Sequence, residues 1–200
     1  MSCNASVPFK SPRHAVTVAV ALVLALGTPA AAQDQQGGAA KGDRAVPATV
    51  SLPNGATSIS ETYGDWNLSC AIADNRKNCL FSQLQGNSET GQRVFAIELQ
   101  PPAGGQTNGV LLLPFGFRLE DGVKLKIDEQ ALGQGARFST CVPAGCLAPV
   151  SFPTVATDAL KRGTSLVVTA NPDGGGEPAT FIVSLAGFTA AMNRVAELAK

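Results

Sequence analysis

Residues 137–149 read RFSTCVPAGCLAP, and this stretch decides much of the fold. Cys141 and Cys146 flank a turn at 143–145, in which Pro comes early and Gly late, as a type I turn prefers. Residues that face each other in an antiparallel hairpin have a constant sum of residue numbers, so the two cysteines lie directly opposite. Their Cα atoms are then about 4.5–5.5 Å apart, a separation that a disulfide can bridge.

A second cysteine pair brackets another turn nearer the start of the chain. Cys70 and Cys79 are centred on Asp74-Asn75, a favourable turn pair, and the same rule places Leu68 opposite Phe81. Sequential pairing therefore gives two hairpin disulfides, which contribute about 2–3 kcal/mol each in the chain-entropy model. A crossed bridge from Cys70 to Cys146 is the alternative and would contribute more than about 4 kcal/mol, but local geometry favours the sequential pairs.

The N-terminus has the layout of a secretory signal peptide. Lys10 and Arg13 precede an apolar run over residues 15–26, and the small residues Ala30-Ala31-Ala32 follow it. Twelve apolar residues are too few for a membrane anchor, which needs about 20. We therefore expect cleavage after Ala32, a periplasmic or secreted mature protein, and no transmembrane segment in the remainder.

Removal of residues 1–32 limits the available chemistry. It takes away two of the 15 basic residues and none of the 15 acidic ones, so the mature net charge is about −2. No clustered basic face is left for nucleic acid. The segment also contains the single histidine, His14, so neither a Ser-His-Asp site nor an imidazole metal ligand is expected. Cys3 leaves too, and the four remaining cysteines, an even number, suit a disulfide framework in an exported chain.

The mature chain divides into a linker, residues 33–60, and a folded domain, residues 61–200. The linker is rich in Gln, Gly, Ala and Pro and has no apolar period, which is typical of disorder. In the domain, apolar residues alternate with polar ones or form short buried runs between turn signals. These patterns predict strands around 66–70, 79–81, 94–99, 110–113, 123–127, 137–140, 146–152, 165–170 and 180–185.

Two short helices are predicted between and after these strands. Thr154 is the expected N-cap of the first, with Gly163 as its stop, and Thr189 is the expected N-cap of the second. Short antiparallel strands with two short helices predict a mainly β fold, a sandwich or a barrel.

The acidic residues and the two large aromatics favour structural roles. Four carboxylates are adjacent pairs next to turns, namely Glu120, Asp121, Asp128 and Glu129. Neighbouring side chains on a strand point to opposite faces, so such pairs are a poor basis for acid–base catalysis. A loop over 173–177 lacks the ligand spacing of a calcium site, and Gly133-Gln134-Gly135 lacks the context of a phosphate loop. Trp66 and Tyr63 could stack on a ligand, but a core position is favoured. No catalytic, metal-binding or cofactor-binding residue is predicted.

Four motifs occur in order over residues 61–195: Tyr63-Gly64-Asp65-Trp66 with Cys70 and Cys79; Leu113-Pro114-Phe115-Gly116; Phe138-x-x-Cys141-x-Pro143-x-Gly145-Cys146; and Leu185-Ala186-Gly187-Phe188 with Ala190-Ala191. Together they resemble the invasion-associated locus B family of bacterial envelope proteins. The resemblance implies an immunoglobulin-like β-sandwich, export, and a part in host-cell entry. It carries over no catalytic residue.

These observations favour an exported, disulfide-stabilised binding module of the cell envelope, linked to invasion or adhesion, that recognises an unidentified protein or an envelope or host surface. Two alternatives stay open: a carboxylate-dependent hydrolase of envelope polymers, and a structural or assembly factor of the envelope. A pocket that gathers two or more carboxylates would favour the enzyme, whereas an apolar or aromatic surface would favour the binding module.

Overall fold

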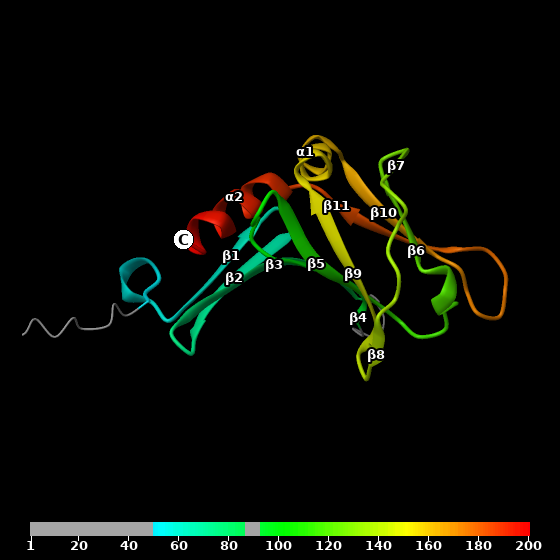
Figure 1. Ribbon diagram of the computed structural model, residues 1–200, viewed down its shortest axis with the longest axis horizontal. Coiled ribbons are helices and arrows are strands. Elements are labelled where there is room, and N and C mark those ends of the chain that lie inside the picture. Colours follow the sequence, from blue (N-terminus) through cyan, green and yellow to red (C-terminus); the bar gives the residue numbers. More distant parts are fainter. Residues whose placement is uncertain (1–49, 87–92) are drawn as a thin grey trace, which may run out of the picture. The chain divides into compact units, whose positions relative to one another are not determined.

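The computed structural model describes residues 50–86 and 93–200. The predicted signal peptide, its cleavage site after Ala32 and most of the predicted linker lie outside these residues. The predicted fold class is confirmed, because the chain forms two antiparallel sheets, two helices and two disulfides (Figure 1).

The larger sheet has seven strands in the order β1-β2-β3-β4-β5-β9-β8, so its first five strands follow the chain. Their bounds are β1 Ser58–Tyr63, β2 Trp66–Ala73, β3 Arg76–Gly86, β4 Arg93–Leu99, β5 Gln106–Leu113, β8 Thr140–Val142 and β9 Gly145–Pro153.

One predicted domain boundary and the start of one predicted strand differ from the structure. Residues 58–60 belong to β1 and pair with residues 69–71, so the predicted domain boundary at residue 61 falls inside a strand. β1 was not predicted as a strand because its sequence is mostly polar, and an edge strand needs few apolar residues. At the other edge, β8 begins at Thr140 rather than at residue 137.

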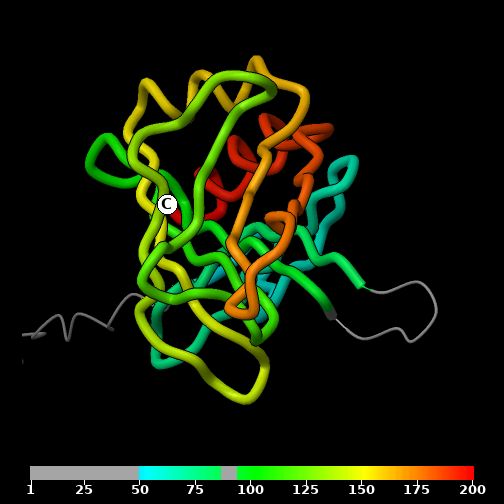
Figure 2. The backbone as a smooth tube through the Cα atoms, turned by 90° about the vertical axis from the view of Figure 1, so that its right-hand side faces the viewer, coloured from blue at the N-terminus to red at the C-terminus, as the bar shows by residue number. Residues whose placement is uncertain are grey.

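The smaller sheet has four strands in the order β11-β10-β6-β7. Their bounds are β6 Val123–Ile127, β7 Gln130–Ala131, β10 Ser165–Ala170 and β11 Ala179–Ser184. Figure 2 shows the strands of this sheet, in light green and orange, running side by side in the foreground. The predicted alternation in β6 is present, since Val123, Leu125 and Ile127 are buried and the two intervening lysines are exposed.

Both predicted helices are present, and Gly163 is the C-cap of the first as predicted, but the N-caps differ from expectation. α1 spans Thr154–Arg162 and α2 spans Phe188–Leu198, and two short 3₁₀ turns lie at Pro53–Gly55 and Leu119–Asp121. Pro153 occupies the N-cap position of α1, and Gly187 in a left-handed conformation occupies that of α2. Thr154 donates its hydroxyl hydrogen bond to the carbonyl oxygen of Gly105, at 2.9 Å, so it holds the helix to the β4–β5 connection instead of capping it.

One face of the larger sheet carries the core, and two elements cover it (Figure 1). α2 packs over β1, β2 and β3, where Trp66 and Phe81 contact Phe188 with ring centroids 5.2 and 5.7 Å apart. Farther along the sheet, Phe95 of β4 stacks on Phe181 of the smaller sheet at 5.0 Å. Trp66 is fully buried, which confirms its predicted core position.

Polar side chains of the larger sheet bond the edge of the smaller one. The indole Nε1 of Trp66 and the amide Nε2 of Gln83 both donate to the carbonyl oxygen of Ser184, at 2.9 and 3.0 Å. Gln83 Oε1 accepts the Ser184 N–H, and Gln85 Nε2 donates to the Ile182 carbonyl oxygen. The N–H and C=O of Ser184 and the C=O of Ile182 at this edge are therefore bonded to side chains of β3 and β2 rather than to another strand.

Candidate functional site

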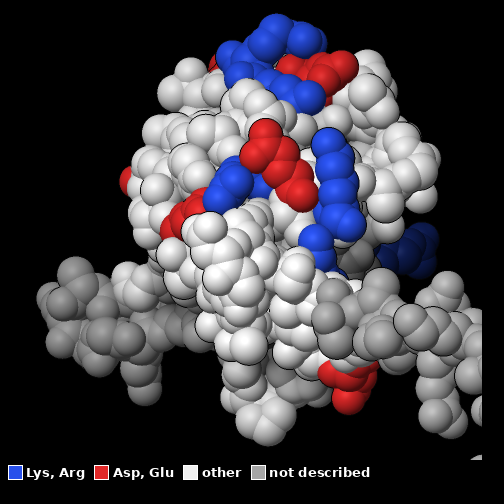
Figure 3. Space-filling model, turned by 90° about the vertical axis from the view of Figure 1, so that its left-hand side faces the viewer, with Lys and Arg blue, Asp and Glu red and all other residues white. Residues whose placement is uncertain are grey.

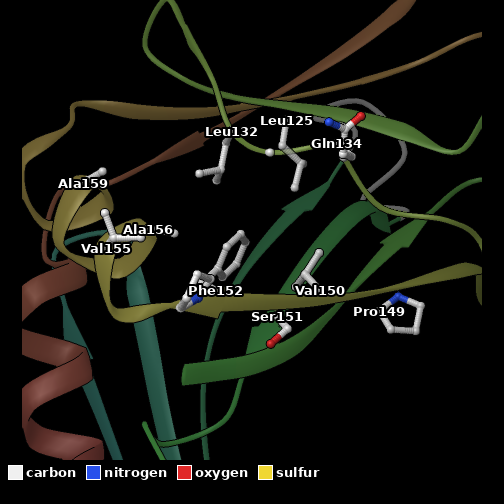
Figure 4. A pocket seen from close by; sticks show the side chains of 13 residues that line it. Leu125, Leu132, Gln134, Pro149, Val150, Ser151, Phe152, Val155, Ala156 and Ala159 are labelled. Atoms are coloured by element: carbon white, nitrogen blue, oxygen red, sulfur yellow. The ribbon is translucent and has the colours of Figure 1, made fainter. Parts of the chain in front are cut away.

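An apolar cavity of about 460 Å³ lies between β9, α1 and the segment that follows β7 (Figure 4). Three separate parts of the sequence form it, and most of its lining is hydrophobic. The lining residues are Leu125, Leu132, Gly133, Gln134, Gly135, Pro149, Val150, Ser151, Phe152, Pro153, Val155, Ala156 and Ala159.

The alternation of β9 determines which of its side chains face the cavity. Val150 and Phe152 point into it from below in Figure 4, toward Leu125 and Leu132 on the opposite wall. Ser151 points to the other face of the sheet, where its hydroxyl donates to Gln106 Oε1 at 2.8 Å. Successive strand residues point to opposite faces, so this β9 sequence gives the cavity an apolar floor.

The first turns of α1 close one end of the cavity. Ala156 is buried and Ala159 half-buried, and both alanines leave open space in front of the helix. Val155 lies on the same rim and is 74% exposed, an unusual position for a β-branched apolar residue. The rim is therefore apolar where it meets solvent.

The Gly133-Gln134-Gly135 segment shapes the opposite rim. Gly135 has φ +82°, and a Cβ at this position would collide with the carbonyl oxygen of Val123. Two backbone hydrogen bonds between Val123 and Ala136, at 2.8 and 2.9 Å, hold the segment against β6. Gly135 brings the backbone close to the sheet and leaves Gln134 exposed on the rim, a role that the sequence did not indicate.

This arrangement can bind an apolar group but offers no acid–base pair. Among the described residues that line the cavity there is no Asp, Glu, Lys or Arg, and its polar side chain is that of Gln134, because the Ser151 hydroxyl lies on the other face of the sheet. Burial of an apolar group here would contribute about 25 cal/mol per Å² of surface removed from water.

Three of the four paired carboxylates that the sequence singled out have partners in the structure. Glu120 and Asp121 both lie next to Arg118, at 3.4 and 3.7 Å, and Asp121 accepts a hydrogen bond from Asn171 at 2.9 Å. Asp128 has a left-handed backbone, and its carboxylate accepts the N–H groups of Ser165 and Thr164.

The backbone hydrogen bonds from Ser165 and then Thr164 lower the pKa of Asp128. Glu129 is exposed beside it, and the 173–177 loop connects β10 to β11. Asp128 was predicted to be a turn residue with a structural role, and its hydrogen bonds to Thr164 and Ser165 agree with that role.

The cysteines are joined as predicted. Cys70 bonds to Cys79 and Cys141 to Cys146, and in each case the two residues are register partners of a hairpin. Their Cα atoms are 4.0 and 3.9 Å apart. Within residues 50–86 and 93–200, no three His, Cys, Asp or Glu side chains come together as a metal-binding group.

A polar contact outside the cavity joins β1 to α2. Arg194 donates to both carboxylate oxygens of Glu61, at 2.9 Å each, and Tyr63 donates its hydroxyl to Glu61 at 2.7 Å. Tyr63 is thus bound to the protein rather than presented for ligand stacking. No local pattern indicates the Arg194–Glu61 pair, whose members are 133 residues apart.

The charged side chains of the surface are mixed. On the face shown in Figure 3, acidic and basic residues lie next to one another, and the part below them carries few charges. Large apolar side chains are also exposed, and they include Leu84, Phe115, Leu119, Val142, Val155 and Ile182. Neither helix in the described part of the chain is long and apolar enough to cross a bilayer.

Comparison with known proteins identifies relatives of this chain. Residues 66–196 match the family model described as "Invasion associated locus B (IalB) protein". An "Invasion protein B homolog" of Brucella abortus is 47% identical over 151 residues, which cover 76% of this chain and 87% of the relative. The "Invasion protein B" of Bartonella bacilliformis is 31% identical over 183 residues, covering 90% and 95%. These relatives are named as invasion proteins and not as enzymes.

A solved structure has the same fold. The crystal structure of invasion associated protein B from Bartonella henselae superimposes with a TM-score of 0.64 at 32% sequence identity. The match covers 70% of this chain and 96% of that one.

Proposed function

The chain belongs to the Invasion associated locus B family, and from this premise we propose that it is an exported binding module of the bacterial envelope, linked to host-cell invasion or adhesion. Its apolar cavity receives apolar side chains of a partner protein. The cavity is the observation that carries the proposal, because it is an open apolar space whose rim includes the exposed Val155.

Two further observations support export. Both disulfides lie in a small β domain, and such bonds persist in oxidising compartments such as the periplasm. The N-terminal sequence before Gln33 has the layout of a signal peptide. Cell fractionation tests this, and we expect to recover the protein in the periplasm or in the medium.

The binding role is tested by filling the cavity. Ala159→Phe places an aromatic ring in it, while Ala190→Phe makes the same change at an exposed position of α2 and serves as the control. We expect Ala159→Phe to lose a cross-linked partner in the envelope and to reduce host-cell entry, and Ala190→Phe to retain both. Near-ultraviolet circular dichroism and abundance verify that each variant is folded.

A folded Ala159→Phe variant that keeps its partner and its phenotype would contradict the cavity as the binding site. A dye that becomes fluorescent in apolar surroundings gives a measurement that is independent of the partner. Its binding should fall severalfold in Ala159→Phe and stay unchanged in Ala190→Phe.

A further inference from the structure

A second interaction surface is found at the edge of the larger sheet. β1 is an edge strand that pairs on one side with β2 in the register Ser60↔Ser69. Thr57, which precedes the strand, accepts a hydrogen bond from the N–H of Ile72, so its backbone groups point toward β2. Backbone direction alternates along an antiparallel strand. The N–H and C=O groups of Ser58, Ser60 and Thr62 therefore point outward.

The other edges are short or are occupied by side chains. β8 has three residues and β7 two, and the groups of β11 at Ser184 and Ile182 bond to glutamine side chains of β3. β1 is an edge along its whole length, and within the described residues no backbone partner is found for the outward groups of Ser58, Ser60 and Thr62. Such an edge is a template for another strand.

β1 also lacks most of the features that block strand addition. It contains no proline, no lysine and no bulge, and its outer side chains Ser58, Ser60 and Thr62 are small and exposed. The charged residue that points toward the core face is Glu61, and Arg194 already binds both of its oxygens. An added strand would therefore not meet an unpaired charge.

We propose that β1 pairs antiparallel with β1 of a second copy of this chain, which joins the two larger sheets into one. Self-pairing fixes the register. When Ser60 faces Ser60 of the second copy, Ser58 faces Thr62 and Ile59 faces Glu61. The outward groups of Ser58, Ser60 and Thr62 then lie opposite those of the second copy. If the register shifts so that Glu61 faces Glu61, the two carboxylates lie opposite each other. If it shifts the other way, so that Ile59 faces Ile59, fewer residues of the two β1 strands are paired. Ser–Ser and Ser–Thr pairs on the exposed face add hydroxyl hydrogen bonds.

The test measures the oligomeric state of the purified full chain by sedimentation velocity over a wide range of protein concentration. We expect a reversible dimer. Ser60→Lys places two lysines directly opposite each other in the dimer, so it should raise the dissociation constant severalfold. Ser69→Lys is the matched control, because Ser69 is exposed on the same face one strand further in. It should leave the dimer unchanged.

The register is tested separately with cysteine variants in a Cys3→Ser chain and a short bifunctional thiol reagent. Ser60→Cys should cross-link to itself, and Ser58→Cys should cross-link to Thr62→Cys but not to itself. A chain that stays monomeric at every concentration overturns the proposal. Equal weakening by Ser60→Lys and Ser69→Lys, or cross-linking of Ser58→Cys to itself, overturns the pairing and its register. None of these results depends on the cavity, so the two proposals fail independently.

Discussion

Arg194 and Glu61 form a bidentate ion pair, with Nε to Oε2 and Nη2 to Oε1 both at 2.9 Å. The two residues lie 133 positions apart and connect the last helix to the first strand of the larger sheet. The hydrogen bond from Arg194, followed by that from Tyr63, lowers the pKa of Glu61. The hydrogen bond that the Tyr63 hydroxyl donates to Glu61 raises the pKa of Tyr63.

Because the pKa of Glu61 is lower in the folded protein than in the unfolded chain, the free energy of unfolding depends on pH at acidic pH. The contribution of Glu61 is fully present above the pKa of the unfolded carboxyl, about 4.3, and is lost as the pH falls through the lower folded value. Glu61→Gln should therefore reduce the melting temperature at pH 7 and flatten its dependence on pH below 5. Glu177→Gln, in the exposed β10–β11 connection, is the control and should leave the curve unchanged. Parallel curves for the two variants would contradict the role of the ion pair.

The hairpin disulfides close short loops and so should stabilise moderately. Replacement of Cys141 and Cys146 by alanine should lower the free energy of unfolding by about 2 kcal/mol in the chain-entropy model, without preventing folding. Denaturant titration measures the loss. Peptide mapping without reduction should recover Cys70 linked to Cys79, and recovery of a peptide that joins Cys70 to Cys146 would show different connectivity in the cell.

The start of the mature chain is a separate prediction. Intact mass or N-terminal sequencing of the exported protein should give Gln33 as the first residue, because Ala30 and Ala32 form the small-residue cleavage signal. Ala32→Asp should slow processing and accumulate the longer form. Processing of this variant at the normal rate would place the cleavage site elsewhere.

The sequence predicted the features that depend on local spacing. Both hairpin registers followed from the positions of the cysteines, and the alternation of β6 followed from a period of two. The locations of both helices and the C-cap Gly163 of the first were predicted correctly, whereas both predicted N-caps were wrong. Gly187 occupies the N-cap position of α2 with a left-handed backbone, and a Cβ there would collide with Tyr63 of β1. Neither constraint is visible in the local sequence.

The candidate site was not predicted because no local pattern encodes it. Its walls come from Leu125, from the segment after β7, and from β9 with α1, and they meet through the packing of two sheets. Gly133-Gln134-Gly135 is the one local signal of the site, and it does not match a phosphate loop. The Arg194–Glu61 pair was not predicted either, because its two residues lie far apart in the sequence.

Two family motifs meet where Gly187 lies against the backbone of Tyr63. A Cβ on Gly187 would collide with the Tyr63 carbonyl oxygen, and Gly187 has φ +86°. Asp65 donates its N–H to the Ala186 carbonyl oxygen at 3.1 Å, so the two segments are also hydrogen-bonded. A side chain at Gly187 must therefore displace β1 or α2.

Gly187→Ala should lower the free energy of unfolding by about 3 kcal/mol or more, because backbone strain and a steric clash act together. Gly133→Ala is the matched control. It also has a positive φ, +61°, but no heavy atom lies within 4 Å of a Cβ there, so strain alone should cost about 1 kcal/mol. Denaturant titration of both variants measures the difference. Equal losses would mean that the close approach of Gly187 to Tyr63 contributes nothing to the need for glycine, and that its left-handed backbone is the whole reason.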